Sequence, residues 1–211
     1  MGMINFFAEN YLLIGEKLLE HLYISVASLA MGIVVAVPLG ILLSKYEKIS
    51  NGVMGVASVL QTIPSFALLA LMIPVFGVGK KTAIAALFIY SLLPILRNTF
   101  LGLTSVTPSA VDAAKGMGME ERQILTKVKI PLALPVIMSG IRLSAVYVLA
   151  WTTLAAYVGA GGLGDFIFNG LNNYVPPMIL WGTIPITALA LLTDHLFGRL
   201  EKRLSPYKGG E

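Results

Sequence analysis

Hydrophobic residues are gathered in five long blocks along the chain, and the short segments between the blocks carry most of the charge. The blocks cover about residues 22–44, 53–76, 82–101, 132–158 and 178–194. A helix of about 20 apolar residues crosses a hydrocarbon core roughly 30 Å thick, and each block is close to that length. The pattern therefore predicts an all-α integral membrane protein with five transmembrane helices in a single domain, residues 1–211.

The segment before the first block, residues 4–19, has a helical periodicity. Its apolar residues recur at alternating steps of three and four: Ile4, Phe7, Tyr11, Ile14 and Leu18. Polar residues occupy the other faces, which predicts an amphipathic helix. Such a helix either lies on the membrane surface or leads directly into the first span.

Small residues and prolines mark the first two blocks. A small residue stands at every fourth position of the first block: Ser28, Gly32, Ala36 and Gly40. Such a stripe lets helices approach closely in lipid, so we expect this face to pack against another helix. The second block contains Pro64 and Pro74, which predict kinks because proline lacks the N–H that a helix needs.

The composition is that of a membrane protein and excludes several other classes. Hydrophobic residues make up 56% of the chain and charged residues 12%, against about 25% charged residues in soluble domains. The net charge of +4 is spread over several short loops, so it does not predict a nucleic-acid partner. Because the chain has no cysteine, thiolate metal sites and disulfides are excluded, and no spacing of other ligand residues predicts a metal.

Lysine and arginine are distributed unequally between the two predicted sides of the membrane. Eleven of them fall on one side: Lys45, Lys48, Arg97, Lys115, Arg122, Lys127, Lys129, Arg199, Lys202, Arg203 and Lys208. The other side has Lys17, Lys80 and Lys81. Since basic loops stay in the cytoplasm, we expect the richer side to be cytoplasmic. The N-terminus is then outside and the C-terminus inside.

The longest polar segment, residues 105–131, lies on the predicted cytoplasmic side. Ser109 and Asp112 have the spacing of a capping box, which predicts the start of a short helix. Gly116 and Gly118 can then adopt the positive φ that ends a helix and turns the chain.

A second helical piece is expected after this turn, at about residues 120–128. It should end near Pro131, where a helix cannot continue unbroken. The result is a compact helix, turn, helix projection from the membrane. The alternative is an ordinary solvated connector, although loops of this length are usually functional or disordered.

The spacing within this loop resembles a family signature. It has D-A-A, then three residues, Gly118, nine residues and V-x-I-P. This is similar to the EAA signature, E-A-A-x3-G-x9-I-x-L-P, of permease subunits of bacterial ATP-binding cassette (ABC) importers. Asp112 replaces the glutamate of that signature, Val128 its isoleucine and Ile130 its leucine, and all three replacements are conservative.

Other segments resemble one group of these permeases more closely. Residues 61–79 (QTIPSFALLALMIPVFGVG), 92–99 (LLPILRNT) and 158–164 (VGAGGLG) look like importers of the quaternary-amine osmoprotectants glycine betaine, carnitine and choline. The resemblance implies a type I ABC importer permease fold with a cytoplasmic coupling helix. It also implies a multi-pass protein of the bacterial cytoplasmic membrane that works by alternating access.

In this family the loop is implied to be a coupling helix that sits in a groove of a separate ATPase subunit. The residues matched to that role are Asp112, Ala113, Ala114, Lys115, Gly116, Met117, Gly118 and Glu121. Small side chains at Ala113 and Ala114 would let the helix lie deep in a partner's cleft. Gly118 would hold the bend.

The resemblance also implies the cofactors and the other partners. This chain has no G-x-x-x-x-G-K-[ST] loop, so ATP and Mg would bind the partner ATPase and no cofactor is expected here. Five spans are few for a complete pathway, which predicts a second permease subunit, identical or homologous. An extracellular or lipid-anchored substrate-binding protein would deliver the solute.

Four aromatic residues are candidates for the solute pathway. They are Tyr90, Tyr147, Trp151 and Tyr157. Aromatic faces attract quaternary ammonium groups, so one or two of them could line a path for betaine-like solutes. The alternative for all four is core packing or anchoring at the membrane interface.

Glycines after the fourth block are candidates for an outer gate. They are Gly159, Gly161, Gly162 and Gly164. Their G-x-G-x-x-G spacing does not predict a nucleotide site, because that fingerprint requires a preceding strand. We expect a flexible break that helps to gate the outer mouth or touches a binding protein; a plain turn is the alternative.

Charged residues inside the blocks suggest structure and not catalysis. Arg142 can reach the cytoplasmic interface or pair with Asp194. His21 and His195 fall at opposite predicted faces and no carboxylate pair shares a pocket, so we expect no enzyme active site. The alternative function is an ion-coupled secondary transporter or channel subunit, which would need polar coordination near mid-membrane and inverted repeats.

Overall fold

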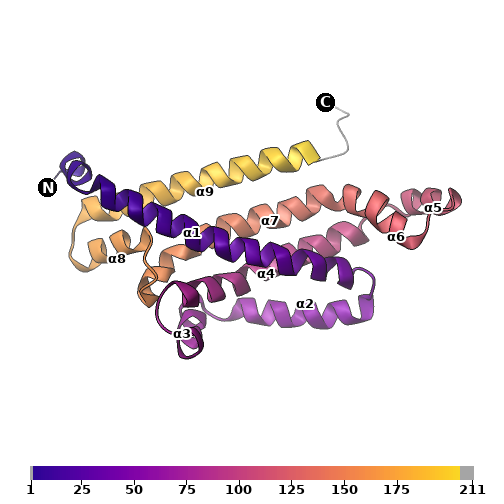
Figure 1. Cartoon of the computed structure of the whole chain (residues 1–211), viewed down its shortest axis with the longest axis horizontal. Coiled ribbons are helices and arrows are strands. Elements are labelled where there is room, and N and C mark those ends of the chain that lie inside the picture. The colour runs from indigo at the N-terminus through magenta and orange to yellow at the C-terminus, as the bar shows by residue number, and fades with distance from the viewer. Residues whose placement is uncertain (1, 205–211) are drawn as a thin grey trace.

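The computed structural model describes residues 2–204, and every regular element in this range is helical. The elements are α1 (Met3–Leu43), α2 (Glu47–Thr62), α3 (Ser65–Phe76), α4 (Lys80–Thr104), α5 (Pro108–Gly116), α6 (Glu121–Ile124), the π-helix η1 (Leu125–Lys129), α7 (Ile130–Thr152), the 3-10 helix η2 (Thr153–Val158), α8 (Gly164–Asn172) and α9 (Pro176–Leu204). Figure 1 shows an elongated bundle whose longest helices run along its long axis, with α5 and α6 at one end and α3 and α8 at the other.

Within residues 2–204, four helical runs are long and apolar enough to cross a membrane. They are α1, α4, the run from Glu121 to Val158, and α9. A fifth crossing results if the bent pair α2 and α3 counts as one span. The all-α membrane fold is therefore as the hydrophobic blocks predict.

α1 joins two segments that the sequence pattern separates. Residues 4–19 and the first block form one helix of 41 residues, so the amphipathic segment leads directly into the first span. A separate helix on the membrane surface is not formed. The apolar stripe of the early segment still has a role, because Phe6 and Ile14 are buried in a small core with Leu163 and Phe166.

The second block is a bent pair of helices and not one straight helix. A bend of 98° separates α2 from α3 at Ile63 and Pro64. Ile63 is extended, at φ −63° and ψ 126°, because a proline disfavours the helical region for the residue before it. Pro74 remains inside α3 near its end, where only two residues of helix follow, so the chain breaks at the first proline alone.

The small-residue stripe of α1 lies against α4, as expected. All four stripe residues are buried. A Cβ added to Gly32 would stand 2.0 Å from Ser91 Oγ, and one added to Gly40 would stand 2.7 Å from Thr99 Cβ. The two helices therefore approach at a distance that only glycine permits.

α4 also packs closely on α7, so it lies between α1 and α7 in the bundle. A Cβ at Gly140 of α7 would stand 2.8 Å from the carbonyl oxygen of Pro94. One core cluster surrounds Ile95, Leu103 and Ile137 toward the α5 end, and a second surrounds Tyr90 toward the α3 end. These contacts form the rigid centre of the fold.

α9 is held on α7 by the ion pair that the sequence suggested. Arg142 donates from Nε to Asp194 Oδ1 at 2.6 Å and from a terminal nitrogen to Asp194 Oδ2 at 2.8 Å. A third, longer bond of 3.3 Å joins Arg142 to Glu201. The guanidinium thus binds two carboxylates about two helical turns apart on α9. These bonds fix the register of α9 against α7.

Candidate functional site

The loop between α4 and α7 projects from one end of the bundle, beyond the ends of α1 and α9 (Figure 1). It contains α5 and α6, with a turn at residues 117–120 between them. The helix, turn, helix projection predicted from the sequence is therefore present. It differs from the prediction in three places: the N-cap of α5, the conformation of Gly116, and the helix at Pro131.

The start of α5 is not the predicted capping box. α5 begins at Pro108, with Thr107 at the N-cap and no side-chain cap hydrogen bond. Proline is favoured at the first helical position because its φ suits the helix and its missing N–H has no partner there anyway. The capping box of the loop is at α6 instead, where Gln123 accepts a hydrogen bond of 3.0 Å from the backbone N–H of Glu120.

The end of α5 depends on Gly118. Gly118 has φ +76°, whereas Gly116 is still part of the helix and does not have the predicted positive φ. The Gly118 N–H donates to Lys115 O at 2.9 Å and the Met119 N–H donates to Ala114 O at 3.1 Å. This pair of bonds is a Schellman motif, which satisfies the last carbonyls of α5 and reverses the chain.

The matched coupling residues differ in exposure. Seven are exposed: Asp112, Ala113, Lys115, Gly116, Met117, Gly118 and Glu121. Ala114 is the exception, with 1% of its surface exposed. Since α5 packs on α6 and η1, the small side chain of Ala114 is required inside this chain, and a partner can meet Ala113 but not Ala114.

The predicted break at Pro131 does not occur. α6, η1 and α7 form one helical run, in which residues 125–129 adopt a π-helix directly before Ile130. A π turn shifts the hydrogen-bond register by one residue, so the chain passes Pro131 without a bend large enough to end the helix. The α6 part of the projection is consequently continuous with α7.

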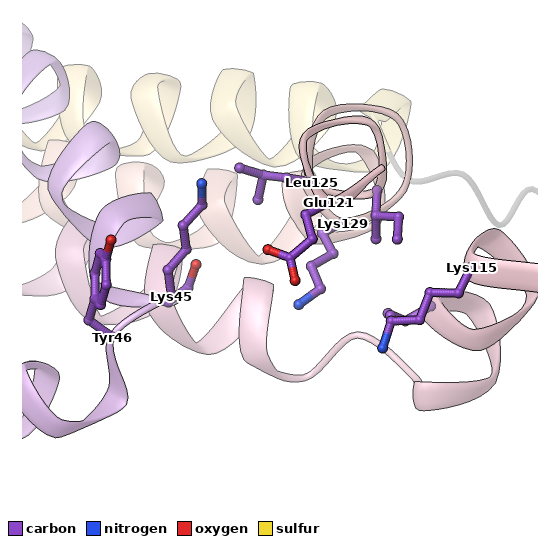
Figure 2. Close-up of a pocket in the computed structure, with 9 residues that line it drawn as sticks. Lys45, Tyr46, Lys115, Glu121, Leu125 and Lys129 are labelled. Carbon is purple, nitrogen blue, oxygen red and sulfur yellow. The ribbon is translucent and has the colours of Figure 1, made fainter. Parts of the chain in front are cut away.

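A cavity of about 480 Å³ separates the projection from the turn that follows α1. Its lining residues are Ser44, Lys45, Tyr46, Val111, Lys115, Glu121, Ile124, Leu125 and Lys129. In Figure 2, Lys45 and Tyr46 lie on one side, Glu121, Leu125 and Lys129 lie across from them, and Lys115 lies beyond on α5. The charges of α5 and α6 form no ion pair with another residue that the structure describes, so they are available to a partner.

The four aromatic candidates for the solute pathway fall into two groups. Tyr90, Tyr147 and Trp151 form one cluster, with ring centroids 4.5 Å apart for Tyr90 and Trp151 and 5.6 Å apart for Tyr147 and Trp151. Tyr90 is buried, and its hydroxyl donates to the carbonyl of Ile63 at the bend. Tyr157 lies apart, against Phe66 of α3 and Phe168 of α8.

The candidate gate glycines form a packed turn. Gly159, Gly161 and Gly162 have φ between +66° and +86°, and Gly161, Gly162 and Gly164 are buried. A Cβ on Gly161 would stand 2.2 Å from Glu20 Oε2. The segment is therefore a tightly fitted turn against α1, in contrast to the flexible break that we expected.

An ion-pair network beside this turn was missed by the sequence analysis. Lys17 Nζ lies 3.0 Å from Glu20 and 2.7 Å from Asp165, and Lys80 Nζ lies 2.8 Å from Glu20. The Gly162 N–H also donates to Glu20, at 3.1 Å. Only the spacing of Lys17 and Glu20 was visible in the sequence, because Lys80 and Asp165 join through the tertiary fold.

Comparisons with known proteins match nearly the whole chain. Residues 28–206 match the family model described as "Binding-protein-dependent transport system inner membrane component". The chain is 56% identical over 209 residues to the carnitine transport permease protein OpuCB of Listeria monocytogenes, covering 97% of this chain and 94% of that protein. It is 48% identical over 187 residues to the glycine betaine/carnitine/choline transport system permease protein OpuCB of Bacillus subtilis, covering 89% and 86%.

Solved structures show the same fold at lower sequence identity. The inward-facing methionine ABC transporter MetNI superimposes with a TM-score of 0.82 at 23% identity, covering 92% of this chain and 97% of that chain. A chain of an amino acid ABC transporter gives a TM-score of 0.79 at 18% identity, covering 96% and 99%. These likenesses establish the type I permease fold for the present chain.

Proposed function

This chain belongs to the family of binding-protein-dependent transport system inner membrane components, and from that premise we propose that it imports quaternary-amine osmoprotectants. It is a multi-pass permease component of an ABC importer. The proposal concerns what it carries, how it meets its partners and how it faces in the membrane. Membership of the family decides against an ion-coupled secondary transporter or channel.

The observation that carries the coupling mechanism is the continuity of the projection with α7. α6, η1 and α7 form one continuous helical run, and the turn at Gly118 joins α5 to the start of that run. A separate ATPase that holds Asp112, Ala113, Met117 and Glu121 could therefore pull on α7 directly. ATP and Mg would bind that ATPase, since this chain has no phosphate-binding loop.

The remaining partners follow from the same arrangement. Two permease subunits, identical or homologous, would enclose the solute path between them, and the α5 end would face the cytoplasm. An extracellular or lipid-anchored binding protein would dock at the opposite end, which carries α3 and α8. ATP binding would draw the two projections together and open the path outward, and hydrolysis would reset the inward state. For the ATPase to drive this change, its contacts with α5 would have to differ between the two states.

The solute class is supported by the names of the relatives. Proteins that are 46% to 56% identical to this chain are named as permeases for carnitine, for choline, and for glycine betaine, carnitine and choline. All three solutes carry a trimethylammonium group. We therefore assign this shared group, and not one particular solute, as the cargo class.

The test is ATP-driven uptake of labelled glycine betaine, carnitine and choline by vesicles that contain the permease, its ATPase and its binding protein. Gly118→Pro should abolish uptake while the chain still inserts, because proline cannot adopt φ +76° and lacks the N–H that bonds Lys115 O. Gly116→Ala is the control, since Gly116 is helical and has no neighbour within 4 Å of an added Cβ. Uptake without the ATPase, or unchanged uptake with Gly118→Pro, would contradict the proposal.

A further inference from the structure

A cavity of about 230 Å³ lies at the end of the bundle opposite α5, between η2 and α8. Its lining residues are Ala156, Tyr157, Asp165, Phe168, Asn169 and Asn172. It is smaller than the roughly 300–1,000 Å³ of pockets for drug-sized ligands, so its size suits a small solute. It is distinct from the cavity beside the projection, and the coupling role of α5 does not use it.

Two aromatic rings line this cavity, and a third ring packs against one of them. The rings of Tyr157 and Phe168 have centroids 4.2 Å apart and are tilted by 59°. Phe66 of α3 packs edge-on against Tyr157, with centroids 4.9 Å apart. Tyr157 nevertheless keeps 60% of its surface exposed. Its ring is held in place by two others and still presents free surface to a ligand.

The polar residues of the cavity indicate that it is open to water, and they include one carboxylate. Asn169 and Asn172 are exposed on α8, and side-chain amides at these positions would be costly against acyl chains. Asp165 adds a carboxylate whose side chain is 28% exposed. Its Oδ2 is paired with Lys17 Nζ at 2.7 Å, and its second carboxylate oxygen forms no ion pair with a described residue.

We propose that this cavity is a transient site for the trimethylammonium group of the transported solute. Aromatic faces and a nearby carboxylate are the two features that attract a quaternary ammonium ion, which can form no hydrogen bond of its own. The inference rests on the proposed solute class and locates that class within the permease. The cavity recognises only the group that the solutes share, so it passes choline as well as the zwitterionic betaines.

An exposed tyrosine elsewhere in the protein supplies a matched control. Tyr23 of α1 is 60% exposed, as Tyr157 is, and it is not among the residues that line this cavity. Tyr23→Leu therefore removes an equally exposed aromatic ring from the same protein without touching the proposed site.

The test measures uptake of labelled choline, carnitine and glycine betaine by the complete importer in vesicles. Tyr157→Leu and Phe168→Leu should each lower uptake of all three solutes by about tenfold, whereas Tyr157→Phe, which keeps the ring, should stay within about twofold of the wild type. Tyr23→Leu should also stay within about twofold. Uptake is normalised to the ATPase activity that the liganded binding protein stimulates, so that only assembled importers count.

Wild-type rates in both leucine variants, or equal losses in Tyr157→Leu and Tyr157→Phe, would overturn this inference alone. A wild-type importer that takes up none of the three solutes would overturn the solute class and this inference with it. Photolabelling of the wild-type importer tests the site even where the leucine variants fail to assemble. A choline analogue that carries a diazirine, irradiated with the wild-type importer, should label residues 156–172, and labelling only elsewhere would overturn the site.

Discussion

At the scale of single residues, two adjacent alanines of α5 have opposite environments. Ala113 is exposed, while Ala114 is 1% exposed and faces the chain's own interior. The resemblance to the EAA signature assigns both to the contact with the ATPase, because the sequence alone cannot say which face of a short helix is covered. In the structure only Ala113 of the two is exposed to a partner, and Ala114 has a packing role within the loop.

This difference predicts separate effects for the same substitution. Ala114→Leu should destabilise the isolated permease by about 1–3 kcal/mol, because the extra carbons do not fit a filled site. Ala113→Leu should leave the isolated permease unchanged and weaken its complex with the ATPase. Thermal unfolding of the permease alone and the affinity of the ATPase for it, measured side by side, separate the two. Equal loss of stability in both variants would show that α5 packs differently.

At the scale of elements, the order of the helices was predictable and their junctions were not. Hydrophobic length locates α1, α4, α7 and α9, and the stripe from Ser28 to Gly40 correctly indicates a close helix partner. A proline in the sequence does not by itself show where a helix ends. Pro64 ends a helix because its predecessor becomes extended, whereas Pro131 follows a π turn that absorbs it. The outcome depends on hydrogen bonds several residues away, which spacing does not encode.

The packing of α4 on α7 gives a prediction at this scale. Gly140→Ala should destabilise the fold by about 1–3 kcal/mol, because the new Cβ would stand 2.5 Å from Asn98 Cβ and 2.8 Å from Pro94 O. The backbone carbonyl cannot move aside without separating the two helices. Thermal unfolding in detergent measures the change.

Gly55→Ala is the matched control for Gly140→Ala. Gly55 lies in α2, and an added Cβ there has no neighbour within 4 Å. This variant should be neutral or slightly stabilising, since alanine favours a helix over glycine. A Gly140→Ala protein as stable as Gly55→Ala would contradict the close approach of α4 and α7.

At the scale of the whole molecule, the two ends of the bundle have different chemistry. One end carries α5 and α6, whose charges form no ion pair with a residue in the described range 2–204. The other end carries an aromatic cavity beside the Lys17, Glu20, Lys80 and Asp165 network. The sequence predicted the first end, because its motif is contiguous from Asp112 to Pro131. It predicted little of the second, because Phe66, Tyr157 and Phe168 come together only through the bend at Pro64 and the turn at Gly159.

Cross-linking to the ATPase tests the coupling role of α5 most directly. It can be made site-specific because the chain has no native cysteine. Met117→Cys lies at the C-terminal end of α5, where Met117 is 70% exposed. Tyr174→Cys lies between α8 and α9, and α8 is at the opposite end of the bundle; Tyr174 is 91% exposed. A bifunctional thiol reagent applied to the assembled importer should join Met117→Cys to the ATPase and leave Tyr174→Cys unjoined to it. Cross-linking of the ATPase through Tyr174→Cys, with none through Met117→Cys, would contradict the assignment of α5 as the coupling element.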